Sequence, residues 1–155
     1  MAIGNNCRAD DGLGWRFVEE IERMGIDFIH YEYRYQLQVE DSALISEYDS
    51  VFFVDATYEA YFDGFNIYDC AGDCDCKFSS HAQSPGAIVS LTNNLYKIFP
   101  KAYIIAICGE QWGLQNYLSE TAERNLQAAV SFFTRHFLPP KLISDSEGNS
   151  LSTIT

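Results

Sequence analysis

Basic residues are scarce in this chain. Ten Lys and Arg stand against 22 Asp and Glu among 155 residues, which gives a formal net charge of −12. A field of this sign repels phosphate backbones and anionic lipid headgroups, so nucleic acid and membrane surfaces are poor candidates for partners. Between residues 35 and 76 there is no Lys or Arg at all, yet there are ten acidic residues. Such a stretch is typical of a solvated face, and its alternative use is docking against a basic region of a partner protein.

Long apolar runs and export signals are also absent. A membrane helix needs about 20 apolar residues, whereas runs such as residues 103–108 are far shorter. The chain does not start with a basic segment followed by an apolar one, so it is predicted to be cytoplasmic. Five cysteines, an odd number, indicate reduced thiols or metal ligands rather than a disulfide framework. Cys70, Cys74 and Cys76 lie close together, either as surface thiols or as an accessory metal or redox site.

The composition is that of a folded protein. Apolar residues make up 47% of the chain, with 10 Tyr, 11 Phe and 2 Trp, which excludes disorder, coiled coil and collagen-like repeats. The length allows one hydrophobic core. We predict a single domain over residues 1–138 and a mobile tail over residues 139–155, which begins at two prolines and is rich in Ser, Thr and Asp.

Apolar patterning predicts alternating strands and helices. Helix starts are indicated by Ser84 followed by Pro85, and by Ser119. The expected strands are residues 1–5, 28–33, 51–55, 65–70 and 102–108, and the expected helices are residues 12–24, 37–48, 85–98 and 120–137. This order predicts an α/β three-layer sandwich with a mostly parallel sheet of about five strands and helices on both faces. The strand at residues 65–70 follows Asp55 too closely for a parallel crossover, so we expect it to be an antiparallel edge strand.

Three candidate ligands fall at the carboxyl edge of this sheet, where α/β proteins bind their ligands. Asp11 follows the first strand, Asp55 ends a buried apolar run, and His81 precedes the Ser84 helix. Two carboxylates and an imidazole form a mixed oxygen and nitrogen set that suits a divalent metal such as nickel, zinc or iron. Each residue also has an ordinary interpretation. Asp10 or Asp11 would cap the first helix, Asp55 would accept backbone hydrogen bonds in a turn, and His81 would be a loop histidine.

The motifs, taken in order, resemble the hydrogenase maturation proteases, the nickel-dependent endopeptidases that trim the large subunit of [NiFe] hydrogenases. The matching segments are Gly4-Asn5 with Asp10-Asp11-Gly12-Leu13-Gly14, Gln36-Leu37 with Glu40, the apolar run from Val51 closing in Asp55-Ala56, Ser80-His81 with Ser84-Pro85, and Ile107-Cys108-Gly109 with Gly113 and Leu118-Ser119. They span about residues 3 to 133. Ala2 and Ala9 stand where the family usually has Gly, and the family's first strand is longer than the three residues that precede Gly4 here.

The resemblance implies a metal-dependent, aspartic-type endopeptidase in which Asp11, Asp55 and His81 recognise nickel and serve catalysis. The nickel would be supplied by the substrate, a precursor of the [NiFe] hydrogenase large subunit, from which a C-terminal extension is cut. The residues themselves offer no Ser/His/Asp or Cys/His nucleophile set. Metal-assisted hydrolysis remains, through a polarised carbonyl or an activated water that Asp10 or Asp11 orients.

Two other functions use the same features. One is a non-cleaving nickel-binding or nickel-delivery module of the same assembly pathway. The other is a nucleotide-binding domain, because Gly4-Asn5 lies between a strand and a helix. The nucleotide interpretation is weak, since the Gly-x-Gly-x-x-Gly spacing and a Walker lysine are absent and two aspartates at a helix entrance repel phosphate.

Overall fold

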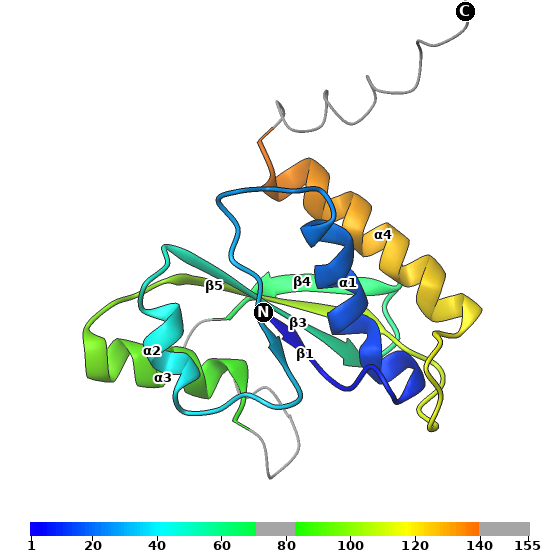
Figure 1. The fold of residues 1–155 in the computed structure, drawn as a ribbon, viewed down its shortest axis with the longest axis horizontal. Coiled ribbons are helices and arrows are strands. Elements are labelled where there is room, and N and C mark those ends of the chain that lie inside the picture. The colour runs from blue at the N-terminus through cyan, green and yellow to red at the C-terminus, as the bar shows by residue number, and fades with distance from the viewer. Residues whose placement is uncertain (71–82, 140–155) are drawn as a thin grey trace, which may run out of the picture.

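A five-stranded sheet with helices on both faces forms the body of the protein (Figure 1). The structure is a computed structural model that describes residues 1–70 and 83–139. The strand order is β2-β1-β3-β5-β4. The first four strands in this order are parallel to their neighbours, and β4 is antiparallel to β5 at the edge. The predicted α/β class, the mostly parallel sheet and the antiparallel edge strand are thereby confirmed.

The elements alternate along the chain as expected. The strands are β1 (Ala2–Ile3), β2 (Tyr33–Arg34), β3 (Ser50–Thr57), β4 (Phe65–Asp69) and β5 (Lys101–Cys108). The helices are a 3₁₀ turn η1 (Ala9–Gly12), α1 (Leu13–Glu22), α2 (Asp41–Ile45), α3 (Pro85–Tyr96) and α4 (Glu120–Phe137). Ser84 and Ser119 cap α3 and α4 as predicted, each accepting a hydrogen bond from a backbone N–H of the first turn. Residues 140–155 of the predicted tail lie outside the described residues.

The predicted strand at residues 28–33 is wrong except for its last residue. Its counterpart β2 is short because its partner β1 has only two residues to pair with. The predicted helix at residues 37–48 is reduced to α2, because the carboxylate of Asp41 accepts from the N–H of Gln38 (2.8 Å) and from Nε of Arg34 (2.9 Å) in the turn before it. Met24 and Ile98, the last residues of the predicted helices 12–24 and 85–98, lie beyond the ends of α1 and α3 and are exposed.

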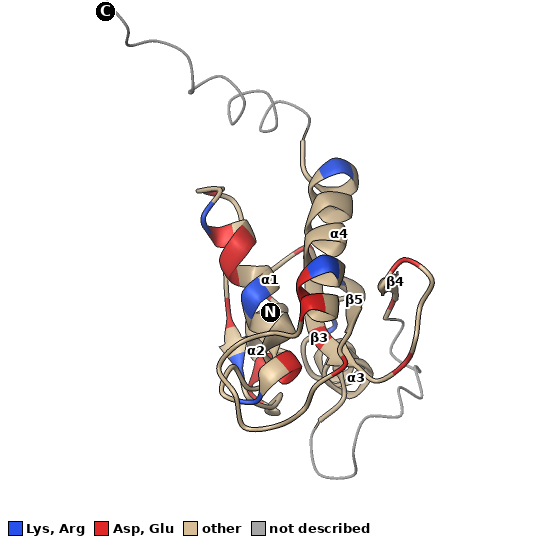
Figure 2. Ribbon diagram, turned by 90° about the vertical axis from the view of Figure 1, so that its right-hand side faces the viewer, with Lys and Arg blue, Asp and Glu red and all other residues tan. Residues whose placement is uncertain are grey.

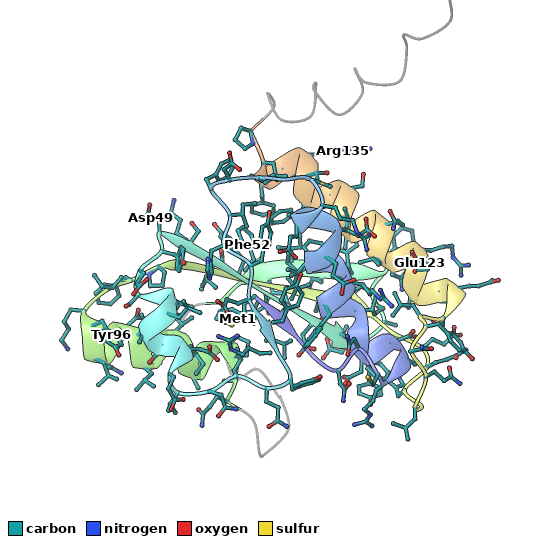
Figure 3. All side chains as sticks on the ribbon, in the orientation of Figure 1. Met1, Asp49, Phe52, Tyr96, Glu123 and Arg135 are labelled. Carbon is teal, nitrogen blue, oxygen red and sulfur yellow. The ribbon has the colours of Figure 1, made fainter. Side chains whose placement is uncertain are left out.

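Two apolar layers lie on the two faces of the sheet. α1 and α4 cover one face, while α2 and α3 pack together on the other. Successive side chains of a strand point to opposite faces, so Val54 of β3 enters the layer below α1 and α4, whereas Phe53 enters the other. Phe52 meets the rings of Phe133 and Phe137 edge-on at 5.0 Å between centroids (Figure 3). In the described part of the chain, no helix is long and apolar enough to span a bilayer.

Gly14 lets the first turn of α1 lie directly on the sheet. A Cβ at this position would come within 2.3 Å of the backbone oxygen of Val54 and 2.4 Å of that of Ile3. Both obstacles are backbone atoms of paired strands, which cannot move aside without breaking the ladder between β1 and β3. The packing of α1 therefore fixes the approach of η1, and with it Asp11, to the sheet.

We expect Gly14→Ala to lower the free energy of unfolding by roughly 3 kcal/mol, because the added methyl overpacks a backbone contact. Urea unfolding followed by circular dichroism measures this loss. Gly113→Ala is the matched control, since a Cβ there meets nothing within 4 Å. Equal stability of the two variants would show that α1 is not seated as closely as described.

Candidate functional site

Asp11 and Asp55 come together around Gly4, the residue that follows β1. A Cβ on Gly4 would lie 2.1 Å from the backbone oxygen of Asp11 and 3.8 Å from Oδ1 of Asp55. Gly4 also has φ = +119°, a conformation that residues with a side chain rarely adopt. The N–H of Asn5 donates to both the backbone oxygen and Oδ2 of Asp11, each at 3.1 Å. Glycine at this position is therefore what allows the two aspartates to approach each other.

Asp55 lies within β3 rather than at its end. The strand continues through Ala56 and Thr57, because β5 pairs with it as far as Cys108. By strand alternation the side chain of Asp55 lies on the same face as Phe53, the face that α2 and α3 cover. It is half-buried, and its Oδ1 accepts a hydrogen bond of 2.8 Å from the N–H of Ala56.

Both carboxyl groups of the pair have raised pKa values. Burial, opposed by the hydrogen bond from Ala56 and aided by the negative charge of Asp11, raises the pKa of Asp55 to about 7. Burial likewise raises the pKa of Asp11, which the charge of Arg8 and the N–H of Asn5 oppose. In residues 1–70 and 83–139, neither carboxylate forms an ion pair with Lys, Arg or His. The pair is therefore a place where a cation is favoured.

The third predicted ligand, His81, lies outside the described residues, as do Cys74 and Cys76. His81 is four positions before Pro85, the first residue of α3, and α3 covers the face of the sheet on which Asp55 lies. Within the described ranges, no three His, Cys, Asp or Glu side chains form a group that could hold a metal. The described part of the chain thus contains two of the three predicted ligands, and the full set stays a prediction.

Asp10, the neighbour of Asp11, has a different role from those that the sequence indicated. It has no exposed surface. Its Oδ2 accepts from the N–H groups of Glu110 (2.7 Å) and Gln111 (2.8 Å) and from Oγ of Ser119 (2.7 Å), and its Oδ1 accepts from the N–H of Ser119 (2.7 Å). Burial alone would raise the pKa of Asp10, but these hydrogen bonds outweigh it and lower the pKa.

These contacts make Asp10 a clamp between η1 and the segment that joins β5 to α4. Two backbone hydrogen bonds reinforce it, from the N–H of Ala9 to the oxygen of Gln115 and from the N–H of Asp10 to that of Gln111. With its oxygens occupied by these donors, Asp10 has no free face with which to orient a water. Neither Asp10 nor Asp11 caps α1, whose N-cap is Gly12 without a side-chain bond. Sequence reasoning missed the clamp because its partners lie about 100 residues away.

Two hollows are present on the described surface. One of about 600 Å³ lies at the opposite edge of the sheet, around the starts of β3 and β5, and is lined mainly by apolar side chains. The other, of about 530 Å³, lies at the carboxyl edge beside the ends of β3 and β5. The carboxylate pair and the second hollow share the edge at which parallel sheets bind ligands, so the candidate site is placed there.

Solved structures with this fold come from hydrogenase maturation. The [NiFe] hydrogenase maturation protease HycI from Thermococcus kodakarensis KOD1 is 20% identical, with a TM-score of 0.68 over 86% of this chain and 87% of that one. The hydrogenase maturating endopeptidase HybD from E. coli is 19% identical, with a TM-score of 0.61 over 86% and 87% of the two chains. The hydrogenase 2 maturation peptidase from Thaumarchaeota archaeon SCGC_AB-539-E09 is 19% identical, with a TM-score of 0.61 over 86% of this chain and 93% of that one.

The fold is thus that of the [NiFe] hydrogenase maturation proteases, as the motifs led us to expect. Neither a protein-family model nor the sequence of a curated protein matches the chain.

We expect Asp10→Asn to lower the free energy of unfolding by about 2–4 kcal/mol at neutral pH. The amide nitrogen would face N–H donors that the carboxylate oxygen now accepts from, and buried donors would be left unpaired. Urea unfolding measures the loss, with Asp27→Asn, a change at an exposed carboxylate, as the control. A stability equal to that of the control would contradict the clamp.

The free energy of unfolding should fall as the pH rises from about 4 to about 7. In this interval the folded protein keeps the proton of Asp55, whose pKa is raised from 3.8 to about 7, whereas the unfolded chain has released it. Because the folded state binds more protons, raising the pH favours unfolding. Asp55→Asn should flatten this part of the profile, measured by urea unfolding at a series of pH values. A variant with the wild-type slope would mean that Asp55 ionises normally.

Proposed function

We propose that the protein is an endopeptidase that removes the C-terminal extension from a nickel-loaded precursor of a [NiFe] hydrogenase large subunit. The observation that carries the proposal is the pair of half-buried carboxylates, Asp11 and Asp55, around Gly4 at the carboxyl edge of the sheet. Its fold is shared with hydrogenase maturation endopeptidases from bacteria and archaea, which supports the same role.

Nickel enters this proposal as part of the substrate. Asp11, Asp55 and His81 would recognise it, and carboxylate and imidazole ligands suit a borderline divalent ion. A bound cation relieves the repulsion between the two carboxylates, so the loaded precursor binds better than the empty one. The metal would thereby report that the precursor is ready to be cut.

The reaction is hydrolysis of one peptide bond. A water adds to the scissile carbonyl, the C–N bond breaks, and the proton passes to the leaving amine. Among the described residues, Oδ1 of Asp11 receives no hydrogen bond, so in this proposal Asp11 has an oxygen with which to orient the water. Nickel of the substrate, held by Asp11, Asp55 and His81, would supply the polarisation of the carbonyl or the activation of the water. Asp10 acts only by positioning Asp11 through the clamp.

Incubation of the protein with nickel-loaded and nickel-free precursor tests the function. Mass spectrometry should show shortening of the loaded form alone. Asp11→Asn, Asp55→Asn and His81→Ala should each abolish shortening while the circular dichroism spectrum stays unchanged, because each removes one ligand. Asp27→Asn and His136→Ala, at exposed positions away from the pair, are the matched controls and should cut normally.

Three outcomes would change the conclusion. Binding of the loaded precursor without shortening would favour a non-cleaving nickel-binding or delivery module. Normal turnover by two of the three ligand variants would refute the site assignment. Equal cutting of loaded and nickel-free precursor would remove the metal from recognition.

A further inference from the structure

A groove of about 530 Å³ lies at the same carboxyl edge of the sheet as the candidate site. It is lined by the loop between β3 and β4 (residues 58–64), by residues 108–110 at the end of β5, and by one face of α4 within residues 121–128. Tyr58, its first lining residue, is three positions after Asp55 in the same chain segment. The N–H of Gly109 donates to the oxygen of Thr57 at 3.0 Å. This hydrogen bond holds the end of β3 next to the end of β5, at the floor of the groove.

The walls of the groove are held by defined contacts. Asp10 binds the N–H of Glu110 on one wall. Nδ2 of Asn125, from α4, donates to the oxygen of Cys108 at 2.9 Å. Gly64, at φ = +77°, leaves room for Asn125, since a Cβ there would lie 2.0 Å from its Oδ1. The carboxylate of Asp10, next to Asp11 in the chain, thus also holds one wall of the groove.

Charge around the groove is predominantly negative. Glu59, Asp63 and Glu110 line it with exposed side chains, and Arg124 is the only Lys or Arg among the described residues that line it. Figure 2 shows acidic residues and no basic ones on the loop that leads into β4. This loop belongs to the stretch of residues 35–76 that lacks Lys and Arg.

Aromatic side chains stand exposed at the rim. Phe62 is fully exposed and Tyr58 is 78% exposed. Tyr58 stacks on Trp112 with 3.8 Å between ring centroids, which joins the loop after β3 to the segment after β5. Exposed aromatic rings beside a groove are typical anchors of protein interfaces.

We propose that this groove binds a basic, extended segment of the precursor. The inference rests on the proposed function and names the part of the substrate that the groove receives. Negative charge excludes an acidic segment and nucleic acid, and a second copy of this chain would carry the same net charge of −12. Basic side chains would face Glu59, Asp63 and Glu110, while Phe62 would cover apolar parts of the segment.

The experiment compares cutting of nickel-loaded precursor by two triple variants of the full chain. Glu59→Gln, Asp63→Asn and Glu110→Gln together remove the charge of the groove. Asp27→Asn, Glu47→Gln and Asp49→Asn remove the same charge from exposed positions outside the groove, and Asp49 lies at the far end of the molecule from Glu123 of α4 (Figure 3). We expect the groove variant to lose about five- to tenfold in kcat/KM through a higher KM, and the control variant to match the wild type.

Salt and Arg124 give two further readouts. The wild-type kcat/KM should fall between about 0.01 M and about 0.1 M salt, over which the Debye length shortens from about 30 Å to about 10 Å, and the groove variant should lose most of this dependence. Arg124→Gln removes the base from the groove and should lower KM.

Each result decides the proposal. Equal KM values for the groove and control variants, in proteins with equal melting temperatures, would overturn the groove while the proposed function stands. Wild-type protein that leaves the loaded precursor uncut would refute the proposed function and the groove's occupant together. A higher KM for Arg124→Gln would show that the segment is not basic.

Discussion

The buried carboxylate of Asp10 is the contact on which the carboxyl edge of this protein depends. Four donors from residues 110, 111 and 119 converge on it, all within 2.8 Å. Removing a charge from water is costly unless it is well hydrogen-bonded, so the carboxylate is stable only where these donors meet. Loops after β1 and β5 and the start of α4 are consequently fixed as a unit, although they are far apart in sequence.

The pKa values of the adjacent residues Asp10 and Asp11 are shifted in opposite directions. Asp10 is completely buried, yet backbone and hydroxyl donors lower its pKa. Asp11 has only one backbone donor to its side chain, and burial raises its pKa against that donor and the charge of Arg8. The difference arises from the donors and charges around each carboxyl group, since the residue type is the same. One aspartate is therefore suited to hold structure and the other to bind a cation.

The sheet could be predicted from the sequence because its central strands are continuous apolar runs. Apart from the half-buried Phe52 and Tyr103, residues 51–54 and 102–108 are buried, and Asp55 is conspicuous as an acidic residue directly after such a run. The bounds of β2 and α2 could not be predicted from local patterns. β2 is limited by pairing with the two-residue strand β1, and α2 begins where the side chain of Asp41 binds the preceding turn.

The Asp10 clamp and the groove had no local signal. Asp10 accepts hydrogen bonds from residues about 100 positions away. In the sequence alone, an acidic pair before a helix is equally typical of a helix cap. The groove combines three segments that only the topology brings together, because β5 lies between β3 and β4 in the sheet. The third ligand, His81, stays a prediction from its motif and its place before α3.

Negative charge at the carboxyl edge acts over two ranges. At contact distance, the Asp11 and Asp55 carboxylates favour a cation because burial and mutual repulsion make two neighbouring charges unfavourable without one. At longer range, the acidic groove attracts basic segments before any contact forms, an effect that mainly raises association rates. In the proposed function, the two effects would select different properties of one substrate, its metal and the charge of a flanking segment. A protein without a bound metal would leave the two carboxylates of the site uncompensated, and a protein without a basic segment would not be attracted to the groove. The negative charge that attracts the substrate therefore also disfavours other proteins.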